Sequence, residues 1–87
     1  MNYTVVWVGT AERALGNIWL LASDRSTVTK AAEAVDRALA TNPEAIGESR
    51  DFNQRIIFSP PLALTYAIHA DDRLVRVLRV WRIRPRS

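Results

Sequence analysis

The chain has 87 residues, a length that fits one domain with a compact core. Its apolar fraction of 48% and charged fraction of 24% are typical of a folded globular protein and exclude a disordered chain. The sequence has no cysteine, which excludes disulfides and thiolate metal sites, and the single histidine, His69, cannot form a zinc site alone; we expect no metal and no cofactor.

Positive charge is concentrated in the last third of the chain. Residues 1–54 contain five Lys/Arg against seven Asp/Glu, whereas residues 55–87 contain seven Arg against two Asp. Eleven of the twelve basic residues are arginine, the side chain suited to two-pronged contacts with phosphate or carboxylate. An anionic partner would explain this composition, and so would a codon bias toward arginine.

The N-terminal residues predict a strand over residues 2–8, because Tyr3, Val5 and Trp7 alternate with polar residues. No basic region and no long apolar run precede it, so we expect neither a signal peptide nor a membrane span, and a cytoplasmic location. Gly9 ends the strand, and Thr10 is a candidate N-cap for a first helix with apolar residues at helical spacing.

A second helix follows at once. Ser23 or Asp24 can cap it, and small apolar residues recur at helical spacing from Val28 to Leu39. It should end near residues 41–42, because Pro43 cannot continue a helix. Two amphipathic helices joined by a short loop predict an antiparallel hairpin that covers a sheet.

The remaining residues supply that sheet. A short extended piece is expected over residues 46–49, and strands over residues 54–58, 62–69 and 74–83. Residues 59–61, Ser-Pro-Pro, separate two of these strands, and residues 71–72, Asp-Asp, mark the next turn. The order β-α-α-β-β-β predicts an α+β fold, with a helical hairpin packed on one face of a mainly antiparallel sheet.

The last strand carries most of the arginines. Strict alternation divides it into two faces, one with Val75, Val77, Arg79, Trp81 and Ile83, the other with Leu74, Arg76, Leu78, Val80, Arg82 and Arg84. Arg79 then interrupts an apolar row, where it either pairs with a carboxylate or lies at a functional site. The other face mixes arginine with leucine and valine, which favours contact with nucleic acid or an acidic partner.

Other aromatic and titratable residues have structural interpretations. His69 adjoins a turn, where an exposed loop histidine is the prediction and a general base the alternative. Tyr66 alternates with apolar residues and is predicted to lie in the core. Trp7, Trp19 and Trp81 are predicted to be core residues whose indole N–H groups find partners at its rim.

Three stretches resemble the C-terminal half of RelE/ParE-family toxins: Glu48-Ser49-Arg50-Asp51 through Arg55-Ile56-Ile57-Phe58, then Leu62-Ala63-Leu64-Thr65-Tyr66, then Asp72 to Trp81 with its RVLRVW ending. The predicted N-terminal strand and helical hairpin agree with that fold. The resemblance thus covers nearly the whole chain and implies a RelE/ParE-like toxin of a type II toxin–antitoxin pair.

RelE-type members cleave mRNA on the ribosome, and the resemblance assigns roles by position. It implies catalytic roles for Arg55, Arg79 and Arg82, since arginine can stabilise the charge of the transition state. Arg50, Arg76 and Arg84 are then expected to bind RNA. The antitoxin is expected to contact the residues of one strand face, namely Leu74, Arg76, Leu78 and Val80.

The sequence departs from the RelE pattern at two places. Leu62-Ala63 stands where the family often has a Tyr-Arg pair, and the terminal segment from Trp81 to Ser87 lacks the usual Gly-His-Arg stretch and late tyrosine. Three functions remain open: a ribosome-dependent mRNA endoribonuclease, a ParE-like gyrase inhibitor, and a non-catalytic toxin-derived binding domain. The expected partners are a cognate antitoxin and either mRNA on the ribosome or DNA gyrase, with no membrane contact.

Overall fold

A computed structural model describes residues 2–50 and 53–83. Its elements follow the predicted order, with a short 3-10 turn before the last strand. They are β1 (Thr4–Trp7), α1 (Gly9–Leu21), α2 (Arg25–Thr41), β2 (Glu48–Ser49), β3 (Gln54–Ser59), β4 (Leu62–His69), η1 (Ala70–Asp72) and β5 (Leu74–Arg82). β4 has the bounds that the sequence predicts, from the residue after the Ser-Pro-Pro segment to His69, just before the Asp-Asp turn.

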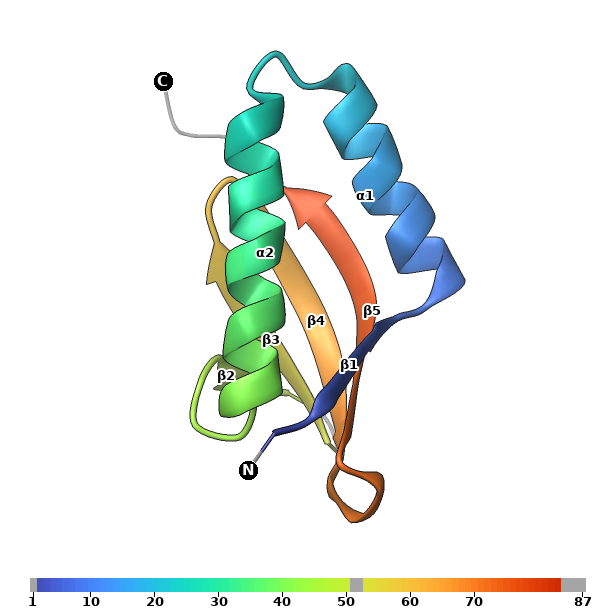
Figure 1. The fold of residues 1–87 in the computed structure, drawn as a ribbon, viewed down its shortest axis with the longest axis vertical. Coiled ribbons are helices and arrows are strands. Elements are labelled where there is room, and N and C mark those ends of the chain that lie inside the picture. The colour runs from blue at the N-terminus through green and yellow to red at the C-terminus, as the bar shows by residue number, and fades with distance from the viewer. Residues whose placement is uncertain (1, 51–52, 84–87) are drawn as a thin grey trace.

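The strands form one sheet in the order β1-β5-β4-β3-β2. All neighbouring pairs are antiparallel except β1 and β5, which are parallel. Figure 1 shows α1 and α2 side by side on one face of this sheet. The predicted α+β fold, a helical hairpin on a mainly antiparallel sheet, is confirmed.

The two helices begin and end close to the expected residues. Asp24 occupies the N-cap position of α2, and the helix ends at Thr41, as Pro43 requires. The expectation that Thr10 caps α1 is wrong, because that helix already begins at Gly9 and Val8 is its N-cap residue. None of the described helices has both the length and the apolar character needed to cross a membrane.

The core lies between the helices and the sheet. On the helical side, α2 contributes Val28, Val35 and Leu39, which are almost fully buried. On the sheet side, the core side chains come from the two central strands, namely Leu62, Leu64 and Tyr66 on β4 and Val75, Val77 and Val80 on β5. Burial of these apolar side chains supplies the main driving force for folding.

A β-bulge interrupts β5 at Leu78. Thr65 pairs with Arg79, while its neighbour Tyr66 pairs with Val77, so Leu78 has no cross-strand partner of its own. A bulge inserts one residue into one strand and shifts the alternation of everything beyond it. The second half of β5 therefore presents the opposite set of side chains to the helices.

The bulge overturns the two predicted faces of this strand. Val80 belongs to the buried core, whereas Arg79 is exposed, so the placement of Arg79 in a core-side apolar row was wrong. Arg82 turns toward the helices, where it meets Asp24. The four residues that precede the bulge, Leu74 to Val77, keep the faces that strict alternation gives them.

The tryptophans differ from one another in burial. Trp7 is half-buried against the core, and its indole Nε1 donates to Asp36 Oδ1 at 2.8 Å, which confirms the prediction for this residue. Trp19 and Trp81 remain 40% and 38% exposed, so their assignment to the core was wrong. Trp81 lies beyond the bulge, and Trp19 lies on the side of α1 that borders a groove between the helices.

Candidate functional site

The face of the sheet opposite the helices is defined by the cross-strand register. We call it the outer face. Three rows of paired residues cross β3, β4 and β5 on this face. They are Phe58, Ala63 and Trp81, then Ile56, Thr65 and Arg79, then Gln54, Ala67 and Arg76.

Small residues of β4 form the floor of the outer face, with larger side chains on both sides. Ala63 and Ala67 have exposed fractions of 0% and 5%, although no helix covers them. Their neighbours on β3 and β5 must therefore close over them. An aromatic residue lies on each side of Ala63, and both rings remain accessible, since Phe58 is 54% and Trp81 38% exposed.

Two arginines of β5 lie on the same face. Arg76 and Arg79 are both exposed, and neither makes an ion pair within the described residues. Exposed arginine beside exposed aromatic rings is a combination that binds phosphates and stacks on planar bases. The outer face is therefore the candidate functional surface of the molecule.

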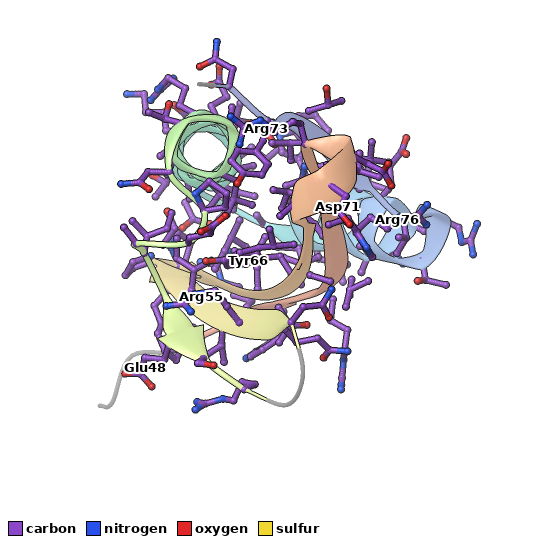
Figure 2. The ribbon with its side chains drawn as sticks, turned by 90° about the horizontal axis from the view of Figure 1, so that it is seen from below. Glu48, Arg55, Tyr66, Asp71, Arg73 and Arg76 are labelled. Atoms are coloured by element: carbon purple, nitrogen blue, oxygen red, sulfur yellow. The ribbon has the colours of Figure 1, made fainter. Side chains whose placement is uncertain are left out.

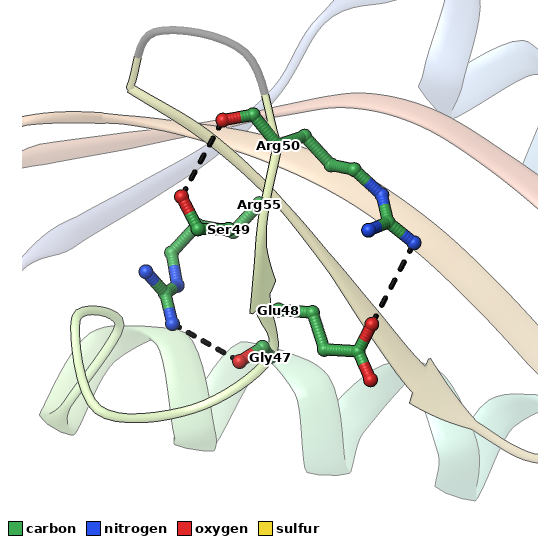
Figure 3. Close-up of polar contacts among 5 residues, drawn as sticks. All are labelled: Gly47, Glu48, Ser49, Arg50 and Arg55. Atoms are coloured by element: carbon green, nitrogen blue, oxygen red, sulfur yellow. Dashed lines mark hydrogen bonds and ion pairs between the residues drawn. The ribbon is translucent and has the colours of Figure 1, made fainter.

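Arg55 lies on the helix side of the sheet. Its Nε donates to the carbonyl of Ile46 at 2.9 Å. Its Nη2 donates to the carbonyl of Gly47 at 3.0 Å (Figure 3). Tyr66 lies beside it, directly across the strand pair (Figure 2). We call Arg55, Tyr66 and Gly47 the loop-supporting cluster, because their polar groups hold the chain between α2 and β2.

Tyr66 confirms the prediction of a core tyrosine. Its side chain is fully buried, and its hydroxyl lies 2.8 Å from the carbonyl oxygens of both Pro43 and Ile46. Burial raises the pKa of this hydroxyl above its ordinary value of 10.0, against an opposing effect of the Arg55 guanidinium. A phenol that remains protonated and donates to buried carbonyls is suited to structural support.

Gly47 completes the loop-supporting cluster. Its φ of 72° lies in the left-handed region that favours glycine. A Cβ at this position would come within 2.6 Å of the carbonyl oxygen of Ile56 and 2.9 Å of the Tyr66 hydroxyl. The backbone can approach β3 and β4 this closely only because residue 47 has no side chain.

A hollow of about 280 Å³ lies beside this cluster, lined by Glu44, Ser49, Asn53, Gln54, Arg55, Ile68 and Ala70. The hollow brings one carboxylate and one guanidinium together. However, Glu44 Oε1 already accepts a hydrogen bond of 2.6 Å from the Tyr3 hydroxyl. The carbonyls of Ile46 and Gly47 likewise occupy two of the five N–H donors of Arg55. The two charged groups of the hollow are therefore already engaged in structural contacts.

Arg82 forms an ion pair at the far end of the sheet. Its Nη2 lies 2.8 Å from Asp24 Oδ2, at the start of α2. The Arg82 guanidinium lowers the pKa of Asp24, and Asp24 in turn raises the pKa of Arg82. This pair ties the end of β5 to the turn between the helices.

The three predicted catalytic arginines therefore lie in three different places. Arg79 is on the outer face, while Arg55 and Arg82 are on the helix side, next to Tyr66 in the middle of β4 and Leu62 at its start respectively. Four residues of strand separate those two positions by about 13 Å. The structure brings none of them together.

The other predicted site residues are also dispersed. Arg50 lies just after β2 and is 3.7 Å from Glu48, with both side chains largely exposed (Figure 3). Arg76 lies on the outer face, and Arg84 falls outside the described residues. Of the predicted antitoxin-contact residues, Val80 is in the core, and Leu78 is half-buried at the bulge beside α1.

Two features of the surface were not predicted. Phe58 was assigned only to a strand, and the bulge that places Trp81 in its row has no local sequence signature.

Arg73 has a φ of 52° and stacks over the Tyr3 ring at 4.9 Å, which joins the start of β5 to the N-terminus. Within the described ranges, no group of three or more His, Asp or Glu side chains could hold a metal ion.

Comparison with solved structures identifies proteins that share this fold. No protein-family model and no curated protein matches the sequence. A chain of the toxin–antitoxin complex RelBE2 from Mycobacterium tuberculosis is similar in structure, with a TM-score of 0.76 and 22% identity over 94% of this chain and 92% of that chain.

Two further structures agree. A chain of the chromosomal ParDE toxin–antitoxin system from P. aeruginosa has a TM-score of 0.70 and 15% identity, over 94% of this chain and 97% of that chain. A chain of the archaeal RelE–RelB complex from Pyrococcus horikoshii OT3 has a TM-score of 0.63 and 17% identity, over 100% of both chains. The chain therefore has the RelE/ParE toxin fold.

Proposed function

We propose that this chain is the toxin of a type II toxin–antitoxin pair and that it acts by binding its target through the outer face. Two of the similar structures are described as toxin–antitoxin complexes or systems that match over more than nine-tenths of both chains. The observation that carries the proposal is the outer face itself, where Phe58, Trp81, Arg76 and Arg79 are exposed around a floor of small residues.

The proposed target is single-stranded RNA, such as mRNA on the ribosome. Aromatic rings stack on bases of any sequence, and each such contact contributes about 1–3 kcal/mol to binding. Phe58 and Trp81 stand on either side of Ala63, with Arg79 one row away. This arrangement can hold two unstacked bases and the phosphates beside them.

Binding without RelE-type cleavage is the form of activity that we propose. Cleavage needs cationic groups and a general base around one phosphate. Arg55 and Arg82 are held by structural contacts on the helix side, so the cationic groups on the described outer face are Arg76 and Arg79. His69 shares the outer face of β4 but lies at its end, next to η1.

The first experiment tests toxicity and the surface together. Induction of the chain in a bacterial host should arrest growth, and co-expression of the neighbouring antitoxin gene should relieve the arrest. Trp81→Ala and Arg79→Ala should each weaken binding to a single-stranded RNA oligonucleotide by about tenfold, equal to roughly 1.4 kcal/mol. Growth that continues normally at high expression would exclude the toxin role.

Matched variants separate the outer face from general effects. Trp19→Ala removes an equally exposed tryptophan, and Arg13→Ala removes an exposed arginine, both from α1 on the other side of the sheet. These two variants should bind RNA like the unaltered protein. Equal losses at Trp19 and Trp81 would show that the outer face has no special role. Cleavage of mRNA by the purified protein with translating ribosomes would contradict the proposal of binding without catalysis.

A second candidate is a ParE-like protein-binding toxin that inhibits gyrase, since the chain shares its fold with the ParDE chain as well as with the RelE chains. It predicts loss of DNA supercoiling by purified gyrase when the protein is added. Unchanged supercoiling at saturating protein would remove this candidate.

The proposed antitoxin contact keeps only the outward residues of the predicted set. Leu74, Arg76 and Leu78 lie along the exposed or half-buried side of β5, whereas Val80 is in the core. An acidic, partly apolar antitoxin segment suits these residues. Leu74→Asp should weaken the complex, measured by calorimetry with the purified antitoxin, and unchanged affinity would exclude this contact.

A further inference from the structure

The third row of the outer face, made of Gln54, Ala67 and Arg76, differs in chemistry from the aromatic first row. Gln54 of β3 and Arg76 of β5 each pair with Ala67 of β4, which stands between them. Val75 and Val77 are fully buried in the core, so Arg76 points to the outer face. Gln54 and Arg76 are both exposed, and an amide and a guanidinium therefore border the same alanine.

The two long side chains of this row are not engaged elsewhere within residues 2–50 and 53–83. Over these ranges Gln54 makes no side-chain hydrogen bond, and Arg76 makes neither a hydrogen bond through its side chain nor an ion pair. The two residues beside Gln54 behave differently, because Asn53 and Arg55 donate to backbone carbonyls. Gln54 and Arg76 thus keep their donors for a ligand.

The spacing of the strands fixes the width of this row. Neighbouring strands lie about 4.8 Å apart, so the backbones of Gln54 and Arg76 are separated by about 10 Å. Ala67 contributes only a methyl group between them and is 5% exposed. A planar ring placed over Ala67 would meet the amide at one edge and the guanidinium at the other.

We propose that the third row recognises one purine base of a single-stranded RNA, with Gln54 selecting adenine and Arg76 selecting guanine. Glutamine binds N6 and N7 of adenine, and arginine binds O6 and N7 of guanine, each through two hydrogen bonds. Pyrimidines have no N7 acceptor, and single-stranded RNA leaves the base edges accessible. This inference rests on the proposed function and adds the identity of one base to it.

The third row reads a different nucleotide from the one that the aromatic row holds. Ala63 and Ala67 are four residues apart on β4, or about 13 Å, whereas stacked bases are about 3.4 Å apart. The rings of Phe58 and Trp81 stack on any base, so they confer no preference. None of the nine residues in the three rows is acidic, and the phosphates between the two nucleotides meet no opposing charge on them.

The test uses fluorescence anisotropy with the full-length chain and uridine oligonucleotides of equal length. Oligonucleotides with one internal adenosine or guanosine should bind at least about tenfold more tightly than the all-uridine one, equal to roughly 1.4 kcal/mol. One internal cytidine should have no effect, and 7-deaza analogues of the purines, which lack N7, should lose the gain. Equal binding of all the oligonucleotides would overturn this inference and leave the proposed function standing, whereas no binding of any would overturn both.

Variants assign the preference to the two side chains. It is measured as the ratio of dissociation constants between the all-uridine and the purine oligonucleotides, so a general loss of affinity cancels. Gln54→Ala should abolish the preference for adenosine and keep that for guanosine, and Arg76→Ala should do the reverse. Asn17→Ala and Arg13→Ala remove an exposed amide and an exposed guanidinium from α1 and should keep both preferences. A purine preference that survives the double variant of Gln54 and Arg76 would overturn the inference.

Discussion

Arg79 lies opposite Thr65 across β4 and β5, immediately beyond the bulge at Leu78. This pairing places Arg79 on the outer face and sends the next residue, Val80, into the core, where it is 7% exposed. The extra residue at the bulge thus determines which arginine is available to a partner. Without it, the outer face would lose Arg79 and Trp81 together.

The bulge predicts that the same substitution has very different effects on stability at two adjacent positions. Val80→Asp should lower the free energy of unfolding by at least about 3 kcal/mol, because it buries an unpaired charge. Arg79→Asp should change it by no more than about 0.5 kcal/mol, as expected of an exposed residue. Urea denaturation followed by circular dichroism measures both.

Should Val80→Asp not fold at all, Val80→Ala provides a milder measure, with an expected loss of roughly 2 kcal/mol from the cavity. If Arg79→Asp were the more destabilising change, β5 would have the faces that strict alternation predicts, and the bulge would be contradicted.

The sequence predicts the elements well because their signals are local. β4 is bounded by Pro61 and by the turn at Asp71, and its alternation is unbroken, so both its ends are predicted. The bulge is different, since Leu78 fits the alternating pattern of a regular strand. Only the pairing with β4 reveals that one residue of β5 is extra.

The role of Arg55 could not be predicted for a related reason. Its partners are the backbone carbonyls of Ile46 and Gly47, which every residue type carries, so no spacing of side chains points to them. An arginine at a family position was therefore assigned a catalytic role. The parallel pairing of β1 with β5 is equally invisible locally, because it joins residues far apart in the chain.

Gly47→Ala should destabilise the protein by more than about 1 kcal/mol, because the left-handed backbone and the close approach of Ile56 both exclude a Cβ. Gly16→Ala is the matched control: it lies within a helix with open space around it, and it should stabilise the protein by up to about 1 kcal/mol. Thermal unfolding of the two variants would contradict the structure if both moved the midpoint in the same direction.

The loop-supporting cluster predicts coupled losses. Arg55→Met should lower the free energy of unfolding by roughly 1–3 kcal/mol, since two carbonyls lose a charged donor, and Tyr66→Phe by roughly 1–2 kcal/mol. Both side chains hold the carbonyl of Ile46, so the double variant should differ from the sum of the single losses by at least about 0.5 kcal/mol. Arg76→Met, on the exposed outer face, is the control and should change stability by less than about 0.5 kcal/mol. Strict additivity in urea denaturation would show that Arg55 and Tyr66 act independently.

The ion pair between Asp24 and Arg82 predicts a pH dependence of stability. The Arg82 guanidinium holds the pKa of Asp24 below its ordinary value of 3.8 in the folded protein. The folded state therefore binds this proton less readily than the unfolded state, and the stabilising contribution is present above that value. It is lost as the pH falls through the folded-state pKa.

Asp24→Asn removes the titrating carboxylate, so the unaltered protein should lose more stability than this variant as the pH is lowered from about 5 to about 2. The difference should be modest, because both side chains are about one-third exposed and solvent screens the pair. Arg82→Ala should show the same shallower dependence, since it removes the cause of the lowered pKa. Urea denaturation across this range measures all three proteins, and identical slopes would mean that the Asp24–Arg82 pair contributes nothing to the stability of the fold.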